Sequence, residues 1–165
     1  MNLFDIKDLY GYDCWANLHM LDTAETVSPG QFTAHADHSH GSLRGTLVHT
    51  FDAEESWRTR MTEGHSTPDV LEEDFPDVAS LRARWQTEQA TMNAFIASLK
   101  DEDLGRTIRY TAGDQEYQRV LWHCIVHMID HGTQHRSEAA AILTGFGRSP
   151  GDVHFMLWIR EHRGR

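Results

Sequence analysis

The sequence predicts an all-α fold, an antiparallel four-helix bundle with a short additional C-terminal helix. Four long segments and one short segment place apolar residues at intervals of three and four, as amphipathic helices do. Strand-like alternation is confined to a few residues, and the chain has no internal repeat or low-complexity tract. A length of 165 residues suits one core, so we expect residues 1–165 to form a single helix-bundle domain.

The first predicted helix covers residues 4–27, with Asp5 as its N-cap. It ends where Ser28-Pro29-Gly30 supplies turn residues. The polar stretch that continues to residue 41 contains a cluster of three histidines, His35, His38 and His40. A metal site there would have to order its own backbone, so we expect a flexible loop rather than a site.

The other predicted helices are separated by turn residues and by an acidic loop. They cover residues 42–64, 77–99, 117–144 and 152–162. The loop at 65–76 contains two prolines, and Gly145 and Gly147 end the fourth long helix. Residues 107–111 alternate briefly before a turn at Gly113-Asp114, which indicates a short strand or extended pair rather than a sheet.

Charge and hydropathy exclude two classes of partner. Twenty-five Asp and Glu against fifteen Lys and Arg give a net charge of −10, whereas a nucleic-acid-binding surface is basic. No apolar run approaches the roughly 20 residues that cross a bilayer, and the N-terminus has no signal-peptide pattern. We therefore expect a cytoplasmic protein that binds neither nucleic acid nor membrane, in which Cys14 and Cys124 are free thiols.

The most informative stretch runs from Trp122 to Glu138, where a histidine recurs at every fourth position. These histidines are His123, His127, His131 and His135. Residues four apart on a helix lie about 5–6 Å apart on one face, so two of these imidazoles can bind one metal ion at about 2.0–2.1 Å. A third ligand then has to come from a facing helix, and His49 is the candidate.

Two known metal-site patterns do not fit this stretch. A zincin needs H-E-x-x-H, but Gly132 follows His131 where the catalytic glutamate belongs. A di-iron bundle needs Glu-x-x-His pairs, and no glutamate in the chain is followed three residues later by histidine. What remains is a mononuclear three-histidine site with an open position. Any adjacent pair of the four satisfies the spacing; Asp130 and Glu138 favour the downstream pair, because metal-bound imidazoles commonly donate to a carboxylate.

Five motifs carry a resemblance to a known family. They are Tyr12-Asp13-Cys14-Trp15-Ala16-Asn17, Leu47-Val48-His49, Glu54-Glu55-Ser56-Trp57, Trp122-His123-x3-His127-x3-His131-Gly132-x2-His135-Arg136 and Gly145-x-Gly147. Through them nearly the whole chain resembles the DinB/YfiT-like family of metal-dependent enzymes. The resemblance implies a four-helix bundle, often a homodimer, in which His49, His131 and His135 bind a divalent metal. The family commonly continues after the arginine with Gly-Gln, where this chain has Ser137-Glu138.

Three neutral imidazoles leave a divalent ion its full charge and an exchangeable position, which is typical of a catalytic site. Characterised members of the family that the chain resembles include thiol S-transferases. The resemblance therefore implies that zinc, nickel or iron activates a low-molecular-weight thiol such as bacillithiol, which attacks a small electrophile. His127 and Arg136 are then candidate catalytic residues beside the ligands or the substrate, and Arg136 could attract an anionic cofactor.

Two other functions stay open at this point. One is a metal-dependent hydrolase in which bound water is the nucleophile. The other is a non-enzymatic, stress-related bundle in which the metal only supports the fold.

Overall fold

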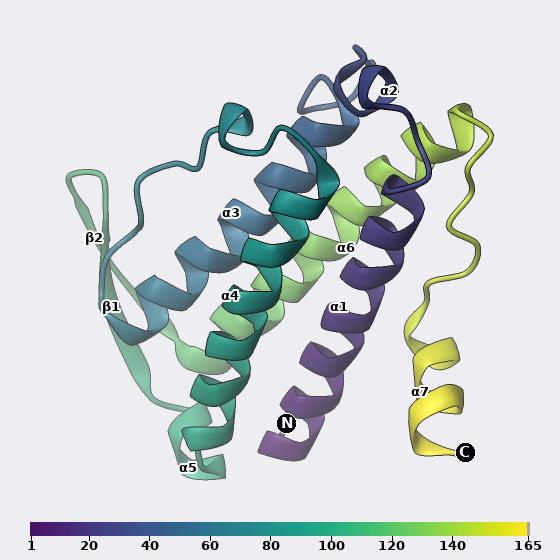
Figure 1. Ribbon diagram of the computed structural model, residues 1–165. Helices are drawn as coiled ribbons and strands as arrows, with labels where there is room; N and C mark the ends of the chain where they lie inside the picture. The colour runs from purple at the N-terminus through teal and green to yellow at the C-terminus, as the bar shows by residue number, and fades with distance from the viewer. Residues whose placement is uncertain (165) are drawn as a thin grey trace.

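The structure is a computed structural model that describes residues 1–164. It is mostly helical, with 66% of the chain in helices, and it includes one small sheet of two strands. The helices are α1 (Leu3–Ala24), α2 (Pro29–Thr33), α3 (Leu43–Thr62), α4 (Val78–Ser98), α5 (Asp101–Leu104), α6 (Leu121–Gly145) and α7 (Phe155–Arg163), and the strands are β1 (Thr107–Ala112) and β2 (Gln115–Val120) (Figure 1).

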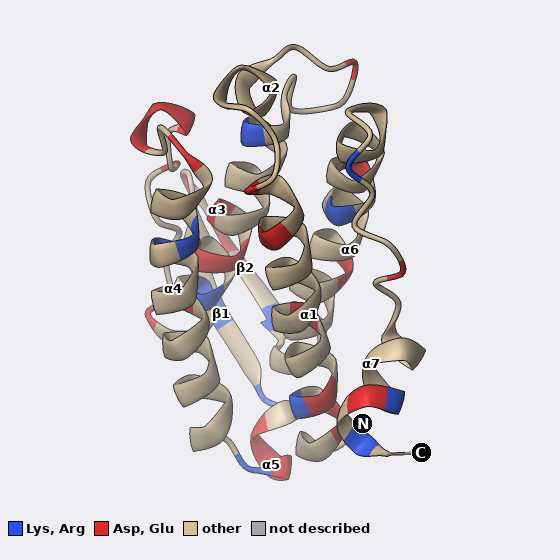
Figure 2. Cartoon of the chain, turned by 45° about the vertical axis from the view of Figure 1, so that its right-hand side comes forward, with Lys and Arg blue, Asp and Glu red and all other residues tan. Residues whose placement is uncertain are grey.

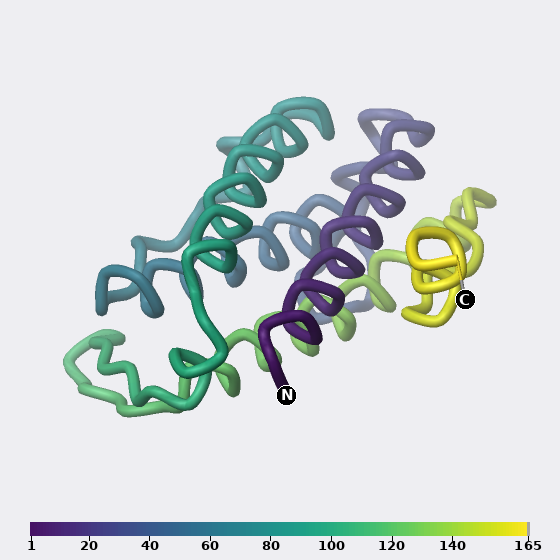
Figure 3. Tube along the Cα trace, turned by 90° about the horizontal axis from the view of Figure 1, so that it is seen from below, coloured from purple at the N-terminus to yellow at the C-terminus, as the bar shows by residue number. Residues whose placement is uncertain are grey.

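The four long helices pack side by side in two layers. One layer consists of α1 and α4 and the other of α3 and α6, and each helix of one layer contacts the other layer (Figures 1 and 3). The closest association is between α3 and α6. This pair carries His49, His131 and His135, so the packing of α3 on α6 positions the histidines.

The directions of the helices differ from the strictly antiparallel order that we predicted. Helices α3 and α4 run in the same direction, opposite to α1 and α6 (Figure 1). The connection from Thr62 to Val78 is long enough to allow α3 and α4 to run in the same direction. Its fifteen residues can span about 50 Å, whereas the 20-residue helix α3 is about 30 Å long, so the chain can return along the whole helix. A single 3₁₀ turn, Glu72–Asp74, lies in this connection.

Two clusters of buried apolar side chains fill the space between the layers. One surrounds Phe51 and Trp85 toward the α2 end, and the other surrounds Ile125 and Met92 toward the hairpin. The rings of Phe51 and Trp85 meet edge to face at 5.9 Å between centroids. None of the residues in either cluster is a histidine.

The β1–β2 hairpin shows that the all-α prediction was wrong. The strands pair antiparallel from Thr107 opposite Val120 to Ala112 opposite Gln115. Alternate side chains of β1, at Ile108 and Tyr110, are buried against the hairpin-side core. The predicted start of the last long helix at residue 117 was also wrong, because residues 117–120 pair with β1 before α6 begins.

Three smaller differences concern helix ends and the first loop. Asn2, not Asp5, caps α1: the Asn2 side chain accepts from the Asp5 backbone N–H, and the Asp5 carboxylate accepts from the Asn2 N–H. The stretch that we expected to be helix-poor contains α2, which Ser28 caps and which begins at Pro29. The short helix α5 was not predicted, and its sequence of Asp-Glu-Asp-Leu offers no apolar period to detect.

The C-terminal helix α7 packs across α1. Trp158 is buried there, and a Cβ atom at Gly11 would lie 2.9 Å from its ring, so only glycine permits this approach. The Tyr12 hydroxyl also donates to the Val153 carbonyl at 3.0 Å. Cys14 and Cys124 are both free thiols. No helix within residues 1–164 is both long and apolar enough to cross a bilayer.

Candidate metal centre

The structure brings together the three histidines that we predicted as ligands. His49 comes from α3, and His131 and His135 lie one turn apart on α6. The Nε2 atom of His131 lies 3.2 Å from Nε2 of His49 and 3.2 Å from Nε2 of His135. Ligand nitrogens around a tetrahedral zinc ion at 2.0–2.1 Å are about 3.4 Å apart, so both of these nitrogen pairs are already near the spacing that a metal requires.

Glu138 fixes the orientation of the His135 ring. Its Oε2 lies 3.1 Å from His135 Nδ1, and its Oε1 accepts from the Ser39 hydroxyl at 3.0 Å. Partial burial works against ionisation of Glu138, but the hydrogen bonds from His135 and Ser39 outweigh it and lower the pKa of this carboxyl. An ionised Glu138 accepts a hydrogen bond from Nδ1–H of His135, and in this tautomer the Nε2 lone pair is directed at His131.

His49 and His131 are neutral at pH 7. Burial, followed by the neighbouring histidines, lowers the pKa of each to about 4. A neutral imidazole holds one proton on two nitrogens, so a single Nε2 proton can satisfy only one of the two 3.2 Å contacts. A cation at the centre satisfies all three lone pairs at once. The donor set therefore fits a divalent transition metal of the zinc, nickel or iron type.

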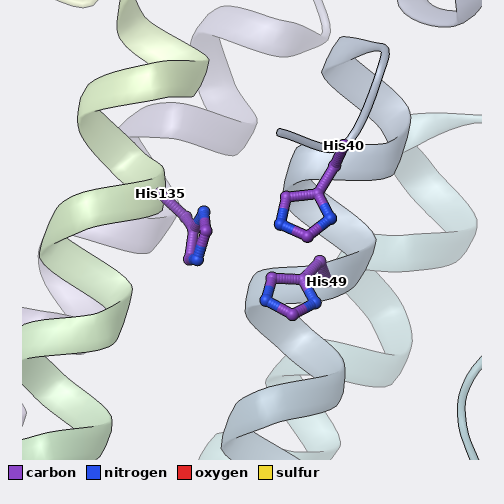
Figure 4. Close-up of side chains that lie close together, drawn as sticks. All are labelled: His40, His49 and His135. Atoms are coloured by element: carbon purple, nitrogen blue, oxygen red, sulfur yellow. The ribbon is translucent and has the colours of Figure 1, made fainter. Parts of the chain in front are cut away.

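A fourth histidine, His40, joins the cluster from the loop before α3. Its ring is stacked on His49 with centroids 3.8 Å apart and an interplanar angle of 17°, and it meets His135 edge to face at 4.9 Å. His40, His49 and His135 each offer a nitrogen within 4.8 Å of the others (Figure 4). Our expectation of a flexible loop missed this residue. The available signal was the helix cap at Ser42, two residues after His40.

The other histidines of the sequence lie outside the cluster. His127 packs edge to face on Trp57 at 4.9 Å, and its ring lies 6.2 Å from that of His131. This places His127 beside His131, and its role toward a substrate stays a prediction. His123 is exposed next to Trp122, and His35 and His38 are exposed in the loop.

Arg136 is directed away from the histidines, unlike our expectation that it would face a substrate. It is buried between α1 and α6, where it forms an ion pair with Asp13 and donates to Asn17 Oδ1 at 2.8 Å. Its second amino group donates to Thr133 Oγ1 at 2.8 Å. With these bonds its guanidinium joins two helices and is not available to an anionic cofactor.

A cavity of about 450 Å³ opens beside the ligands between α3, α6 and the hairpin. Its lining includes three histidines, His49, His127 and His131, together with Asp52, Trp57 and Arg60. The Arg60 guanidinium lies over the Trp57 ring, 4.7 Å from its centroid, and its Nε donates to Ser66 Oγ at 2.9 Å. This cavity is large enough for a small molecule to reach the histidine nitrogens.

A second recess of about 380 Å³ adjoins the first at His49. It is lined by His40 and by three carboxylates, Asp52, Asp69 and Glu72. Acidic side chains gather in the connection before α4, of which Glu72 is part, and at α5 (Figure 2). The two hollows share His49, Asp52 and Asp69 in their linings, so His49 borders both.

One comparison with known proteins identifies relatives of this chain. The family model described as the DinB family matches residues 1–163, nearly the whole sequence. No curated protein matches the chain.

Proposed function

The chain belongs to the DinB family, and we propose that it is a divalent-metal-dependent thiol S-transferase whose metal ligands are His49, His131 and His135. The observation that carries the proposal is the convergence of three Nε2 atoms, 3.2 Å apart along two edges, beside a 450 Å³ cavity that His49 and His131 line. We further propose that the chain is one helix-bundle domain that acts as a cytoplasmic homodimer.

The reaction joins a thiol to an electrophilic carbon. A divalent ion in this position supplies the acidity that allows a thiol to lose its proton near neutral pH. The thiolate sulfur forms a bond to the carbon, the leaving group departs with its electron pair, and the thiol proton passes to solvent. Zinc, nickel and iron all suit a ligand set of three imidazoles.

The side chains around the cavity have separate tasks in this reaction. Glu138 holds His135 so that its Nε2 stays unprotonated. Trp57 and His127 pack together and form an aromatic wall beside His131. Arg60 takes the part that we expected of Arg136, because it is the cation that lines the cavity and can attract a carboxylate of a thiol such as bacillithiol.

The first test is metal content, measured by mass spectrometry on protein purified without a histidine tag or chelator. We expect about one equivalent in the native chain, and its loss in His49→Ala and in His131→Ala. His123→Ala is the matched control, because His123 has the same spacing on α6 but is exposed outside the cluster. A native chain that stays metal-free after incubation with zinc or nickel would refute the proposal.

The second test is turnover of small electrophiles by the metal-loaded protein. We expect product only when a low-molecular-weight thiol is present. Turnover without added thiol would assign the site to hydrolysis by bound water instead. Arg60→Gln should raise KM for a carboxylate-bearing thiol more than for an uncharged one, which separates binding of the thiol from activation of its sulfur.

A further inference from the structure

We propose that His40 is a fourth protein ligand of the same metal ion, so that the loop before α3 closes the position that a three-histidine site leaves open. This inference rests on the proposed metal centre and adds a residue to it. Its starting point is that the His40 ring lies beside His49 and His135 in the structure. In the sequence His40 belongs to a loop and not to the helical histidine repeat.

The His40 ring is close enough to bind after a small adjustment. Its centroid lies 3.8 Å from that of His49 and 4.9 Å from that of His135, and a nitrogen of each ring lies within 4.8 Å of the others. Nitrogens that share one ion are about 3.4 Å apart in a tetrahedral site. A tilt of the His40 ring out of its stack with His49 brings its nitrogen into this range.

The loop that carries His40 is already ordered by its own hydrogen bonds. The backbone N–H of Ala36 donates to Gly41 at 2.8 Å, and that of Gly41 donates to His38 at 3.0 Å. Gly41 has a φ of +68°, a conformation that favours glycine, and the next residue, Ser42, caps α3. Binding of His40 to a metal therefore does not require a disordered segment to fold.

A side-chain bond also connects this loop to a ligand on α6. The two oxygens of Glu138 divide between Ser39 of the loop and His135, at 3.0 and 3.1 Å. Any displacement of the loop thus disturbs the carboxylate that orients His135. The loop position and the ligand geometry are coupled through a single side chain.

A fourth nitrogen changes how the site would be used. Four protein ligands complete a tetrahedral shell, so an external ligand has to displace one of them. His40 is the ligand on a loop, whereas the other three lie on the packed helices α3 and α6. Its departure frees one position of the coordination shell, and His49 and His131 connect this shell to the cavity that Arg60 lines. A thiol would then bind where His40 had been.

The test is the visible absorption of the cobalt(II)-loaded protein with and without azide, a small ligand for an open position. We expect the native chain to give intense tetrahedral bands that azide leaves unchanged. In His40→Ala we expect weaker or shifted bands that respond to azide, and zinc affinity reduced roughly 10-fold or more in competition with a chelator. His38→Ala is the matched control, because His38 is an exposed histidine of the same loop.

A second variant tests the same ligand position by introducing a new metal ligand instead of removing a side chain. His40→Cys should add a sulfur-to-cobalt charge-transfer band in the near ultraviolet if residue 40 reaches the metal. Unchanged spectra and affinity in His40→Ala, with no such band in His40→Cys, would overturn the fourth ligand and leave the three-histidine site standing. A native chain that takes up no cobalt would overturn the metal centre itself.

Discussion

Glu54 is a carboxylic acid in the middle of the helix packing. It is 3% exposed, and its two oxygens accept from the Tyr10 hydroxyl and the Trp85 Nε1–H, both at 2.6 Å. Burial, followed by the charge of Asp13, raises its pKa from 4.5 to about 8. The two donors supply hydrogen bonds but no positive charge, so they offset this rise only in part.

The raised pKa of Glu54 predicts a pH dependence of stability. In the folded protein Glu54 holds its proton up to about pH 8, whereas in the unfolded chain it releases the proton near its ordinary value of 4.5. The folded state therefore binds more protons between these values, and the contribution of Glu54 to the free energy of unfolding falls as pH rises from 4.5 to 8. The slope is at most about 1.4 kcal/mol per pH unit for one proton.

Urea unfolding of the metal-free native chain and of Glu54→Gln, over this pH range, measures the effect. We expect the difference in unfolding free energy to shift in favour of Glu54→Gln as pH rises, because glutamine cannot ionise. The histidines titrate in both proteins and cancel in the difference. A difference that is constant with pH would show that Glu54 does not titrate in this range.

At the scale of elements, α1 and α6 approach closely at Gly132. A Cβ atom there would lie 2.8 Å from Arg136 Nη1 and 3.0 Å from Asp13 Oδ1. These two groups form a buried ion pair, so neither can move without losing hydrogen bonds. The glycine that weakens the helix locally is thus required by the contact between the helices.

Gly132→Ala should therefore destabilise the protein although alanine is the better helix former by about 1 kcal/mol. We expect a net loss of about 1–3 kcal/mol, as for other overpacked sites. Gly145→Ala is the control: Gly145 is also in α6, but no atom lies within 4 Å of its added Cβ. A Tm of Gly132→Ala equal to or above that of the native chain would contradict the close contact of α1 and α6 at this residue.

The elements also show what the sequence could and could not predict. Apolar spacing located α1, α3, α4 and α6, because each buries one face against a common core. It failed for residues 117–120, whose strand conformation depends on pairing with β1. Apolar spacing did not predict that α3 and α4 run in the same direction either, because the sequence of the connection between them does not indicate where it runs.

The same limit applies to the site. His131 and His135 were detectable because helix geometry converts a spacing of four into proximity. His49 could be proposed only by elimination and by family resemblance. His40 was missed because its position depends on the Ser39–Glu138 contact, which joins residues 99 positions apart. Arg136 was assigned to the substrate side although its partners, Asp13 and Asn17, lie on a helix more than a hundred residues away in the sequence.

At the scale of the whole molecule, the metal centre and the core are separate. The core clusters are built from apolar side chains of all four long helices, and no cluster histidine belongs to them. A site of this kind differs from a structural metal site, whose binding energy is needed for folding. We therefore predict that removing the metal abolishes activity but leaves the helices folded.

Circular dichroism and thermal unfolding of metal-loaded and chelator-treated protein test this separation. We expect unchanged helical signal at 25 °C and a lower Tm, since an ion at 100 times its Kd stabilises the native state by about 2.7 kcal/mol. His131→Ala should show the chelator-treated Tm whether or not metal is added, and His123→Ala should respond as the native chain does. Loss of the helical signal on chelation would instead assign the metal a structural role, in which its binding energy is needed for folding.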